Sequence, residues 1–137
     1  MRVFVDTNIL IDVLAQRNGF LEAAQVLAYT NKQGYSLHVS TLTMANVAYI
    51  MRKTLRGDML YGELNKISSI VNVESLTREN YDSALQLKAK DFEDALQYFC
   101  AKECQCDVIV TRNMDDFSFS KIEIVTPEEF LKKWQIL

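Results

Sequence analysis

Short apolar runs alternate along this chain with longer stretches in which apolar residues recur every three or four positions. The short runs are typical of buried strands, and the longer stretches are typical of helices with one apolar face. Strands are expected at residues 2–5, 35–40, 71–76, 107–111 and 122–125. Helices are expected at residues 9–14, 20–31, 41–56, 60–70, 77–87 and 91–103, and a last one begins after Thr126. Thr7 or Asn8 is expected to cap the first of these helices.

Strands of this length that alternate with helices predict an α/β fold in which helices cover both faces of a mostly parallel sheet. The expected architecture is therefore a three-layer α/β/α sandwich. The chain has 137 residues with only four Gly and one Pro, and no linker or repeat interrupts the alternation. Residues 1–137 are expected to form a single domain.

Composition and charge exclude some classes of function. The net charge of −3 argues against the broad basic surface of a DNA-wrapping protein, although a local basic patch can still bind nucleic acid. No apolar run approaches the roughly 18 residues that span a bilayer, and no charged-then-apolar signal segment opens the chain. We expect a cytoplasmic protein that does not associate with membranes.

Three cysteines lie close together, at Cys100, Cys104 and Cys106. Their spacing fits no disulfide framework, and a zinc site would lack its fourth ligand, so reduced thiols are expected. The only histidine, His38, lies in a predicted strand and is expected to be structural. No Ser-His-Asp or Cys-His arrangement is expected.

Acidic residues gather where the last long helix begins, at Asp91, Glu93 and Asp94. A helix N-cap explains Asp91 adequately. It explains Asp94 less well, because an acid one turn into the helix, beside core residues, needs solvent or a cation. Parallel sheets bind ligands beyond the carboxyl ends of their strands. Asp6 follows the first strand and Asp116 follows the fourth, so these acids are expected to meet Asp94 at one edge.

Crowded carboxylates repel one another unless a cation lies between them, and their oxygens suit Mg²⁺ or Mn²⁺. Each acid taken alone is equally well explained as a strand end or a solvated loop. The whole set, in this order, favours a metal site. Two basic features lie elsewhere: the cluster of Arg52, Lys53 and Arg56 at one-turn spacing beside Tyr49, and Arg112 close to Asp116. The first suits phosphate binding or an ordinary helix C-terminus; the second suits a scissile phosphate or the neutralisation of the acids.

Several segments resemble the PIN domains, a family of metal-dependent ribonucleases that includes the VapC-like toxins. The matching segments follow the family's order over essentially the whole chain: 5–10 (VDTNIL), 40–47, 91–97 (DFEDALQ), 109–113 (IVTRN) with 116–117, and 125–131. The chain departs from the family pattern at Asn46, where a Glu is usual, and at Asn113, where an Asp is common.

The resemblance implies an RNA phosphodiesterase whose metal is held by acids, and it assigns roles to particular residues. The implied catalytic residues are Asp6, Asp94 and Asp116. The implied metal ligands are these three with Asp91, Asn46 and Asn113. Expected contacts to substrate are Thr7, Asn8, Thr111, Arg112, Arg52 and Arg56.

The function expected first is a Mg²⁺- or Mn²⁺-dependent endoribonuclease, the toxin of a type II toxin–antitoxin pair with a small antitoxin partner. The alternative is a PIN-fold protein with weak or lost catalysis that binds RNA or protein, and Asn46 and Asn113 favour it. Phosphatases of the haloacid dehalogenase type need an acid two residues after Asp6, where this chain has Asn8. The resemblance also implies a homodimer, and apolar side chains at Leu27, Tyr49 and Ile50 are expected to form its interface.

Overall fold

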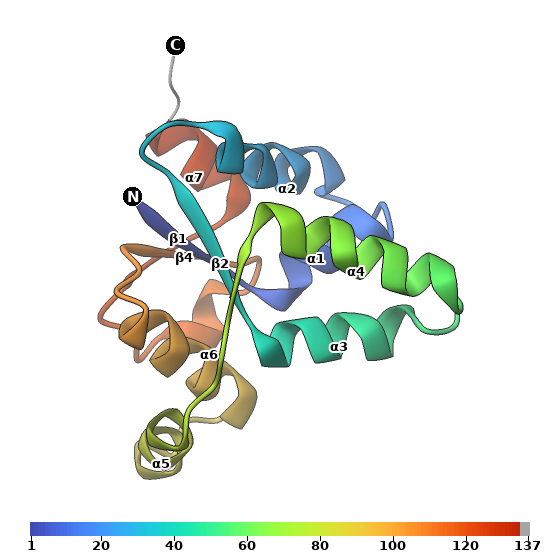
Figure 1. Ribbon diagram of the computed structural model, residues 1–137. Coiled ribbons are helices and arrows are strands. Elements are labelled where there is room, and N and C mark those ends of the chain that lie inside the picture. The colour runs from blue at the N-terminus through green and yellow to red at the C-terminus, as the bar shows by residue number, and fades with distance from the viewer. Residues whose placement is uncertain (135–137) are drawn as a thin grey trace.

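The computed structural model describes residues 1–134 of the chain, and its five strands form one fully parallel sheet (Figure 1). The order across the sheet is β3-β2-β1-β4-β5. The strands are β1 (Arg2–Val5), β2 (Ser36–Ser40), β3 (Asn72–Glu74), β4 (Val108–Val110) and β5 (Glu123–Val125). The chain therefore builds outward from β1 through β2 to β3, then returns to the other side of β1.

Helices connect successive strands, as the alternating pattern predicts. They are α1 (Thr7–Leu14), α2 (Phe20–Leu27), α3 (Thr41–Met51), α4 (Asp58–Ile70), α5 (Arg78–Leu87), α6 (Phe92–Glu103) and α7 (Pro127–Lys133). Two short 3-10 helices, η1 (Ala28–Asn31) and η2 (Met114–Phe117), complete the described elements.

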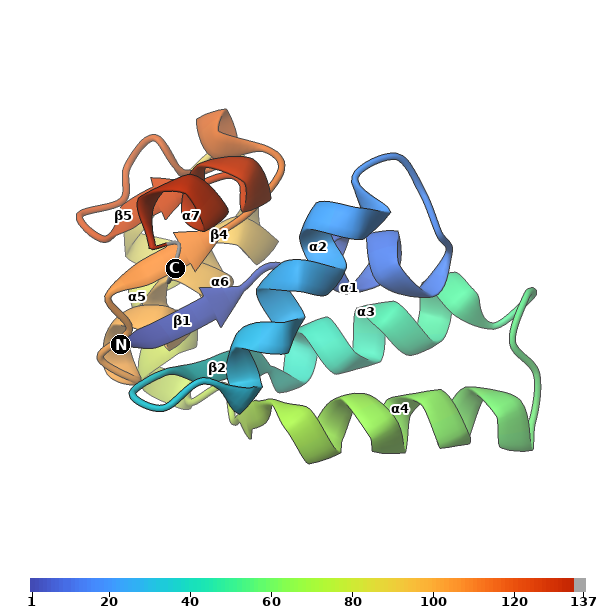
Figure 2. The same ribbon diagram turned by 90° about the horizontal axis from the view of Figure 1, so that it is seen from above.

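Alternation along the strands separates two apolar cores, one on each face of the sheet. Val3 and Val5 pack with α1, α2, α3 and α7 on one face, whereas Phe4 packs with α6 on the other. Figure 2 shows α2 and α7 covering the first face, and α3 and α4 lying side by side and extending beyond the sheet. The helix α5 packs on the outside of α6. The three-layer α/β/α sandwich is confirmed.

Element boundaries differ from the expected ones mainly at helix ends. The second helix tightens into η1 after Leu27, and α3 ends at Met51 because Arg52 hydrogen-bonds back to the carbonyl oxygen of Tyr49. The N-cap expected at Asp91 is confirmed, and Thr77 and Thr126 cap α5 and α7. The cap expected at Thr7 or Asn8 is wrong: Asp6 caps α1 by accepting a hydrogen bond from the Thr7 amide.

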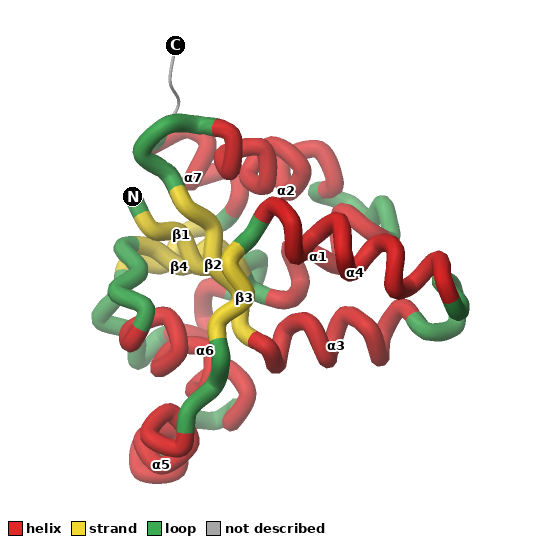
Figure 3. Tube along the Cα trace, viewed as in Figure 1, coloured by secondary structure: helices red, strands yellow, loops and turns green. Residues whose placement is uncertain are grey.

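Edge strands are shorter than expected. The β3 strand spans only three residues between α4 and α5, and Figure 3 shows it at the open side of the sheet. Loop therefore replaces strand on either side of it. None of the helices in residues 1–134 is both long and apolar enough to cross a bilayer.

Candidate active site at the carboxyl edge of the sheet

The site is built around Asp6, which directly follows β1. The chain adds β2 and β3 on one side of β1, and then β4 and β5 on the other side. The Asp6 amide donates a hydrogen bond to the carbonyl oxygen of Val110, which ties it to β4. Its Oδ1 accepts from the Thr7 amide at 2.8 Å, and its Oδ2 accepts from the Thr111 hydroxyl at 2.8 Å. Only 7% of the residue is exposed. Burial raises the pKa of Asp6, although the hydrogen bonds from Thr111 and Thr7 oppose this, and Asp116 and Asp91 raise it further.

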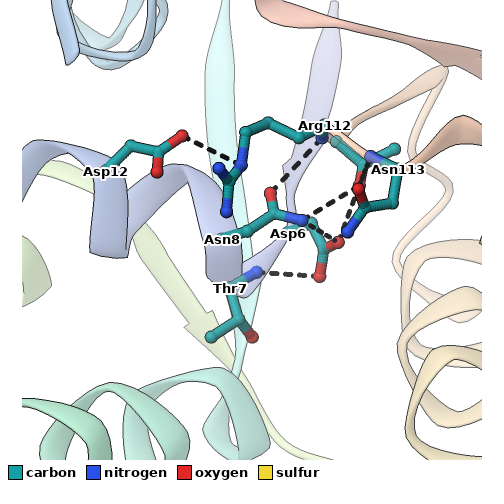
Figure 4. A network of polar contacts seen from close by, with 7 residues as sticks. Asp6, Thr7, Asn8, Asp12, Arg112 and Asn113 are labelled. Atoms are coloured by element: carbon teal, nitrogen blue, oxygen red, sulfur yellow. Dashed lines mark hydrogen bonds and ion pairs between the residues drawn. The ribbon is translucent and has the colours of Figure 1, made fainter. Parts of the chain in front are cut away.

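Asn8 links the start of α1 to the loop after β4 (Figure 4). Its Nδ2 donates to Asp6 Oδ2 at 3.2 Å, and its Oδ1 accepts from the Arg112 amide at 3.4 Å. The Asn113 amide donates to the Thr111 hydroxyl at 3.1 Å. These contacts hold the β4 loop against β1, so Asn113 and Asp116 are presented on the same edge as Asp6.

Asp94 approaches Asp6 from the first turn of α6. Asp91 caps this helix, because its Oδ1 accepts from the Asp94 amide at 3.0 Å. Half-burial, and then the negative charges of Asp91, Asp6, Asp116 and Glu93, raise the pKa of Asp94 to about 7. The carboxylates are thus close enough to destabilise one another's ionised form.

A single pocket collects most of the predicted site residues. We name it the acid pocket and define it by its lining: Asp6, Thr7, Asn8, Ile11, Arg17, Asn46, Tyr49, Ile50, Asp91, Glu93, Asp94, Gln97, Asn113 and Asp116. All six predicted metal ligands lie in it, together with two of the predicted substrate contacts. Thr111 and Arg112 lie next to it through their contacts with Asp6 and Asn8.

Asn46 lies on the wall of the pocket that α3 supplies. The helix begins at Thr41, as expected, so Asn46 lies in its second turn. Its Nδ2 lies 3.4 Å from Glu93 Oε2 as a hydrogen-bond donor. Glu93 was not among the predicted site residues. Its place directly before Asp94 in the sequence could have indicated that it lies at the site.

The lining suits a divalent cation in its chemistry. Carboxylate and amide oxygens are the ligands that Mg²⁺ and Mn²⁺ prefer. Burial first, and neighbouring acids second, raise the pKa values of Asp6 and Asp94, and a bound cation would offset both effects. Within residues 1–134, no three His, Cys, Asp or Glu side chains are already gathered closely enough to form a ready-made metal site. The residues fit the ion by type and by position around the pocket.

The predicted basic contacts are engaged elsewhere. Arg112 extends toward Asp12 and away from the Asp6 carboxylate (Figure 4), with its Nε 3.1 Å from Asp12 Oδ2. The Arg52 guanidinium stacks on the Tyr49 ring, 3.7 Å from its centroid, and Arg56 donates to the carbonyl oxygen of Lys53. Arg52 and Arg56 thus satisfy the end of their own helix, which is the alternative that the sequence left open.

A buried polar network lies beneath the pocket and was missed by sequence reasoning. Gln97, one turn after Asp94, donates to the hydroxyls of Thr43 and Thr7 (3.3 Å to Thr7) and accepts from the Ser40 hydroxyl. Ser40 and Thr43 are fully buried, and Gln97 is 2% exposed. The spacing of Gln97 from Asp94 was visible in the sequence, but the threonine partners were not. Thr7 therefore directs its hydroxyl into this network.

Ser36, His38 and Glu74 form a chain of side-chain contacts that the sequence did not indicate. Ser36 Oγ lies 2.8 Å from His38 Nε2, and His38 Nδ1 lies 2.8 Å from Glu74 Oε1, because neighbouring strands place these side chains on one face. His38 is only 2% exposed, so the imidazole satisfies polar groups inside the sandwich, as a structural histidine does. The cysteines are free thiols: Cys100 and Cys106 are buried and Cys104 is half-buried, and burial raises the pKa of Cys106 to about 12.

Comparison with known proteins agrees with this architecture. A family model described as "PIN domain" matches residues 2–115. Ribonuclease VapC1 of Aquifex aeolicus is 26% identical over 142 residues, which cover 99% of this chain and 97% of that protein.

Two solved structures share the fold. One is Mycobacterium tuberculosis VapC20, described as a toxin that cleaves the sarcin-ricin loop: 14% identity, TM-score 0.68, 88% of this chain and 98% of that chain covered. The other is a toxin–antitoxin complex from Klebsiella pneumoniae: 24% identity, TM-score 0.66, 91% and 97% covered. The match of the family model over most of the chain, on a fold with acids at the expected edge, shows that this chain belongs to the PIN domain family.

Proposed function

We propose that this chain is an endoribonuclease that hydrolyses RNA phosphodiester bonds with a divalent cation, Mg²⁺ or Mn²⁺, as the toxin of a type II toxin–antitoxin pair. The observation that carries the proposal is the gathering of Asp6, Asp94 and Asp116 around one pocket at the carboxyl edge of a PIN-domain sheet. The resemblance to proteins described as ribonuclease and toxins supports the choice of RNA as substrate.

Each of these residues has a task in the proposed reaction. Hydrolysis joins a water oxygen to phosphorus, breaks one P–O ester bond and gives a proton to the departing oxygen. A bound divalent cation would supply hydroxide at neutral pH and offset charge on that oxygen. Asp6, Asp94 and Asp116 are the proposed principal ligands, with Asp91, Asn46 and Asn113 around them. Asn8, Arg112, Arg52 and Arg56 remain proposed contacts to RNA, whereas Thr7 and Thr111 hold the framework of the site.

The hydrogen bonds around Asp6 suit it to this task. Because Thr7 and Thr111 each donate to a different carboxylate oxygen, the Asp6 side chain is fixed before any ligand arrives. Asp94 is carried on the first turn of α6, whose cap fixes that turn in the same way. Pre-organised ligands reduce the entropy that a bound ion would otherwise cost.

A second candidate function is RNA or protein binding with weak or lost catalysis. The observation in its favour is that Asn46 and Asn113 bring neutral amides to the acid pocket where the family pattern has carboxylates. An amide oxygen can still ligate a cation, but it contributes no charge. The two candidates differ in whether RNA is cut after it is bound.

Purified protein should cut single-stranded or loop RNA in Mg²⁺ or Mn²⁺ and stop when EDTA is added. Cleavage should fall at least about 100-fold in Asp6→Asn, because a fixed anionic ligand is lost. The measurement is product formation on a panel of labelled RNAs, with Asp115→Asn as the control because Asp115 lies outside the acid pocket. If the panel stays intact across metals while RNA still binds, the enzyme is excluded and the binding protein is favoured.

The partners follow from the same proposal. We propose a small antitoxin protein and a second copy of the chain as partners, a cytoplasmic location, and one domain over residues 1–137, of which 135–137 lie outside the described residues. Tyr49 and Ile50 are 65% and 45% exposed on α3, as an interface requires. Leu27 is wrong as an interface residue, because it is 8% exposed and packs in the core.

A further inference from the structure

The acid pocket contains a cation that sequence reasoning did not select. Among the described residues that line it, Arg17 is the one basic side chain. It is exposed, and it makes no ion pair with the acids of residues 1–134, whereas Arg112 and Arg78 do. A free guanidinium on the wall of a strongly acidic pocket needs an explanation beyond solubility.

The backbone that carries Arg17 is fixed although its side chain is exposed. Arg17 lies in the turn between α1 and α2, where its amide donates to the carbonyl oxygen of Asp12 at 3.1 Å. Its own carbonyl oxygen accepts from the Phe20 amide at 2.9 Å. Gln16, just before it, has a left-handed φ of 50° that turns the chain at this point. Arg17 is thus presented from an ordered turn.

Asp12, on α1, is the buried carboxylate that pairs with Arg112. It is only 1% exposed, so water does not screen its carboxylate. The Nε of Arg112 lies 3.1 Å away as an ion pair, but its angle is not that of a hydrogen bond, and both oxygens lack hydrogen-bond partners among the described residues. Burial raises the pKa of Asp12, and the positive charges of Arg112 and Arg17 lower it. The charge of one buried carboxylate therefore acts on both guanidinium groups.

We propose that Arg17 binds a phosphate of the RNA substrate at the mouth of the acid pocket, and that buried Asp12 is a positioning residue for Arg112. This inference rests on the proposed function. An RNA strand carries its negative charge past Asp6, Asp91, Asp94 and Asp116, so a nearby cation must offset the repulsion. A guanidinium donates two parallel hydrogen bonds to a phosphate and suits this task better than an ammonium.

Arg17 is better placed for this than the cations that the sequence selects. Arg52 and Arg56 bind the end of their own helix, and Arg112 is paired with Asp12. Arg17 lines the same pocket as the proposed catalytic acids and has no competing partner there among the described residues. The geometry places its charge beside the site.

The test measures binding of a fluorescein-labelled single-stranded RNA in EDTA, where cleavage cannot interfere, over a series of salt concentrations. Arg17→Ala should weaken binding about tenfold and reduce the slope of log K against log salt by about 0.7, the value for one phosphate on a single strand. Arg17→Lys should keep the slope and lose part of the affinity. Arg78→Ala is the matched control, since Arg78 is an exposed arginine paired with Asp82 on α5, and it should bind as wild type does.

Asp12→Asn separates positioning from simple charge. Removing a negative charge near a polyanion should tighten RNA binding if Asp12 acts only as a charge. If Asp12 positions Arg112, binding should weaken about threefold despite the more positive protein. Tighter binding by Asp12→Asn would overturn the role of Asp12, and wild-type affinity with an unchanged slope in Arg17→Ala would overturn the role of Arg17. The cleavage assay in Mg²⁺ tests the proposed function, on which this inference rests, separately: if wild type cuts RNA but binds none in EDTA, only the role of Arg17 is overturned.

Discussion

At the scale of single residues, the proposed ligand Asp94 lowers the stability of the folded protein at neutral pH when no ion is bound. The pKa of Asp94 rises from its ordinary 3.8 to about 7, first because of burial and then because of neighbouring acids. Between these two pH values the folded protein holds a proton that the unfolded chain has released. The free energy of unfolding therefore falls as the pH rises from 3.8 to about 7, and it stays at the lower value above that range.

Asp94→Asn should reveal this cost. In EDTA the variant should melt about 2–4 °C above wild type at pH 8, which corresponds to roughly 1 kcal/mol after allowance for the partial exposure of the side chain. The difference should shrink to almost nothing below about pH 3, where Asp94 is protonated in both the folded and the unfolded state. Thermal unfolding followed by circular dichroism measures it, with Asp115→Asn as the control. A variant that melts below wild type at pH 8 would mean that Asp94 holds the fold together.

The acids could be predicted from the sequence, whereas their partners could not. Asp6 and Asp94 lie at ends of strongly patterned elements, so topology alone places them at one edge. Arg112 illustrates the limit. Its side chain extends to Asp12 on α1, whose burial depends on how α1 packs on the sheet. Side-chain direction in a loop leaves no periodic signal.

At the scale of elements, Gln97 joins three helices that carry the site. It contacts Thr7 in the first turn of α1, Thr43 and Ser40 at the start of α3, and it belongs to α6 itself. Each helix brings one wall of the acid pocket, so this network sets the distances between those walls. Buried hydroxyls without partners cost about 1–3 kcal/mol each.

Gln97→Leu should therefore lower both stability and cleavage. The melting temperature should fall by about 3–10 °C, because the change removes the hydrogen bonds that Gln97 makes with Ser40, Thr43 and Thr7. Cleavage at a temperature well below melting should also fall, because Asp6 and Asp94 lose their fixed separation. Gln25→Leu, at an exposed position on α2, is the matched control. A stable Gln97→Leu variant with full cleavage would show that the network does not align the site.

Existence and order of the elements followed from apolar periodicity, but their ends did not. The β3 strand is shorter than its apolar run because it pairs only with β2 and lies at an open side of the sheet. The end of α3 at Met51 depends on Arg52, whose guanidinium caps the helix and stacks on Tyr49. Local hydrogen bonds of this kind decide a boundary without changing the hydrophobic pattern that predicts the element.

At the scale of the whole molecule, α3 and α4 form an arm that extends beyond the sheet (Figure 2). The loop 52–57 joins them, and exposed apolar side chains lie on both sides of it. They are Tyr49 (65% exposed), Ile50 (45%), Met59 (66%) and Tyr61 (67%). Apolar surface gathered at one end of an arm is typical of an interface rather than of a solvated helix.

We expect this arm to mediate pairing of two copies. Equilibrium sedimentation of wild type at tens of micromolar should give the mass of a dimer, and Ile50→Asp should give a monomer, because burying a carboxylate at an apolar contact is costly. Both proteins should melt within about 2 °C of each other, since Ile50 lies outside the core. Leu21→Asp, at a position 68% exposed on α2, should remain dimeric. A wild-type monomer at these concentrations would contradict pairing of two copies through the arm. The next measurement would then be whether the proposed antitoxin binds wild type and fails to bind Ile50→Asp.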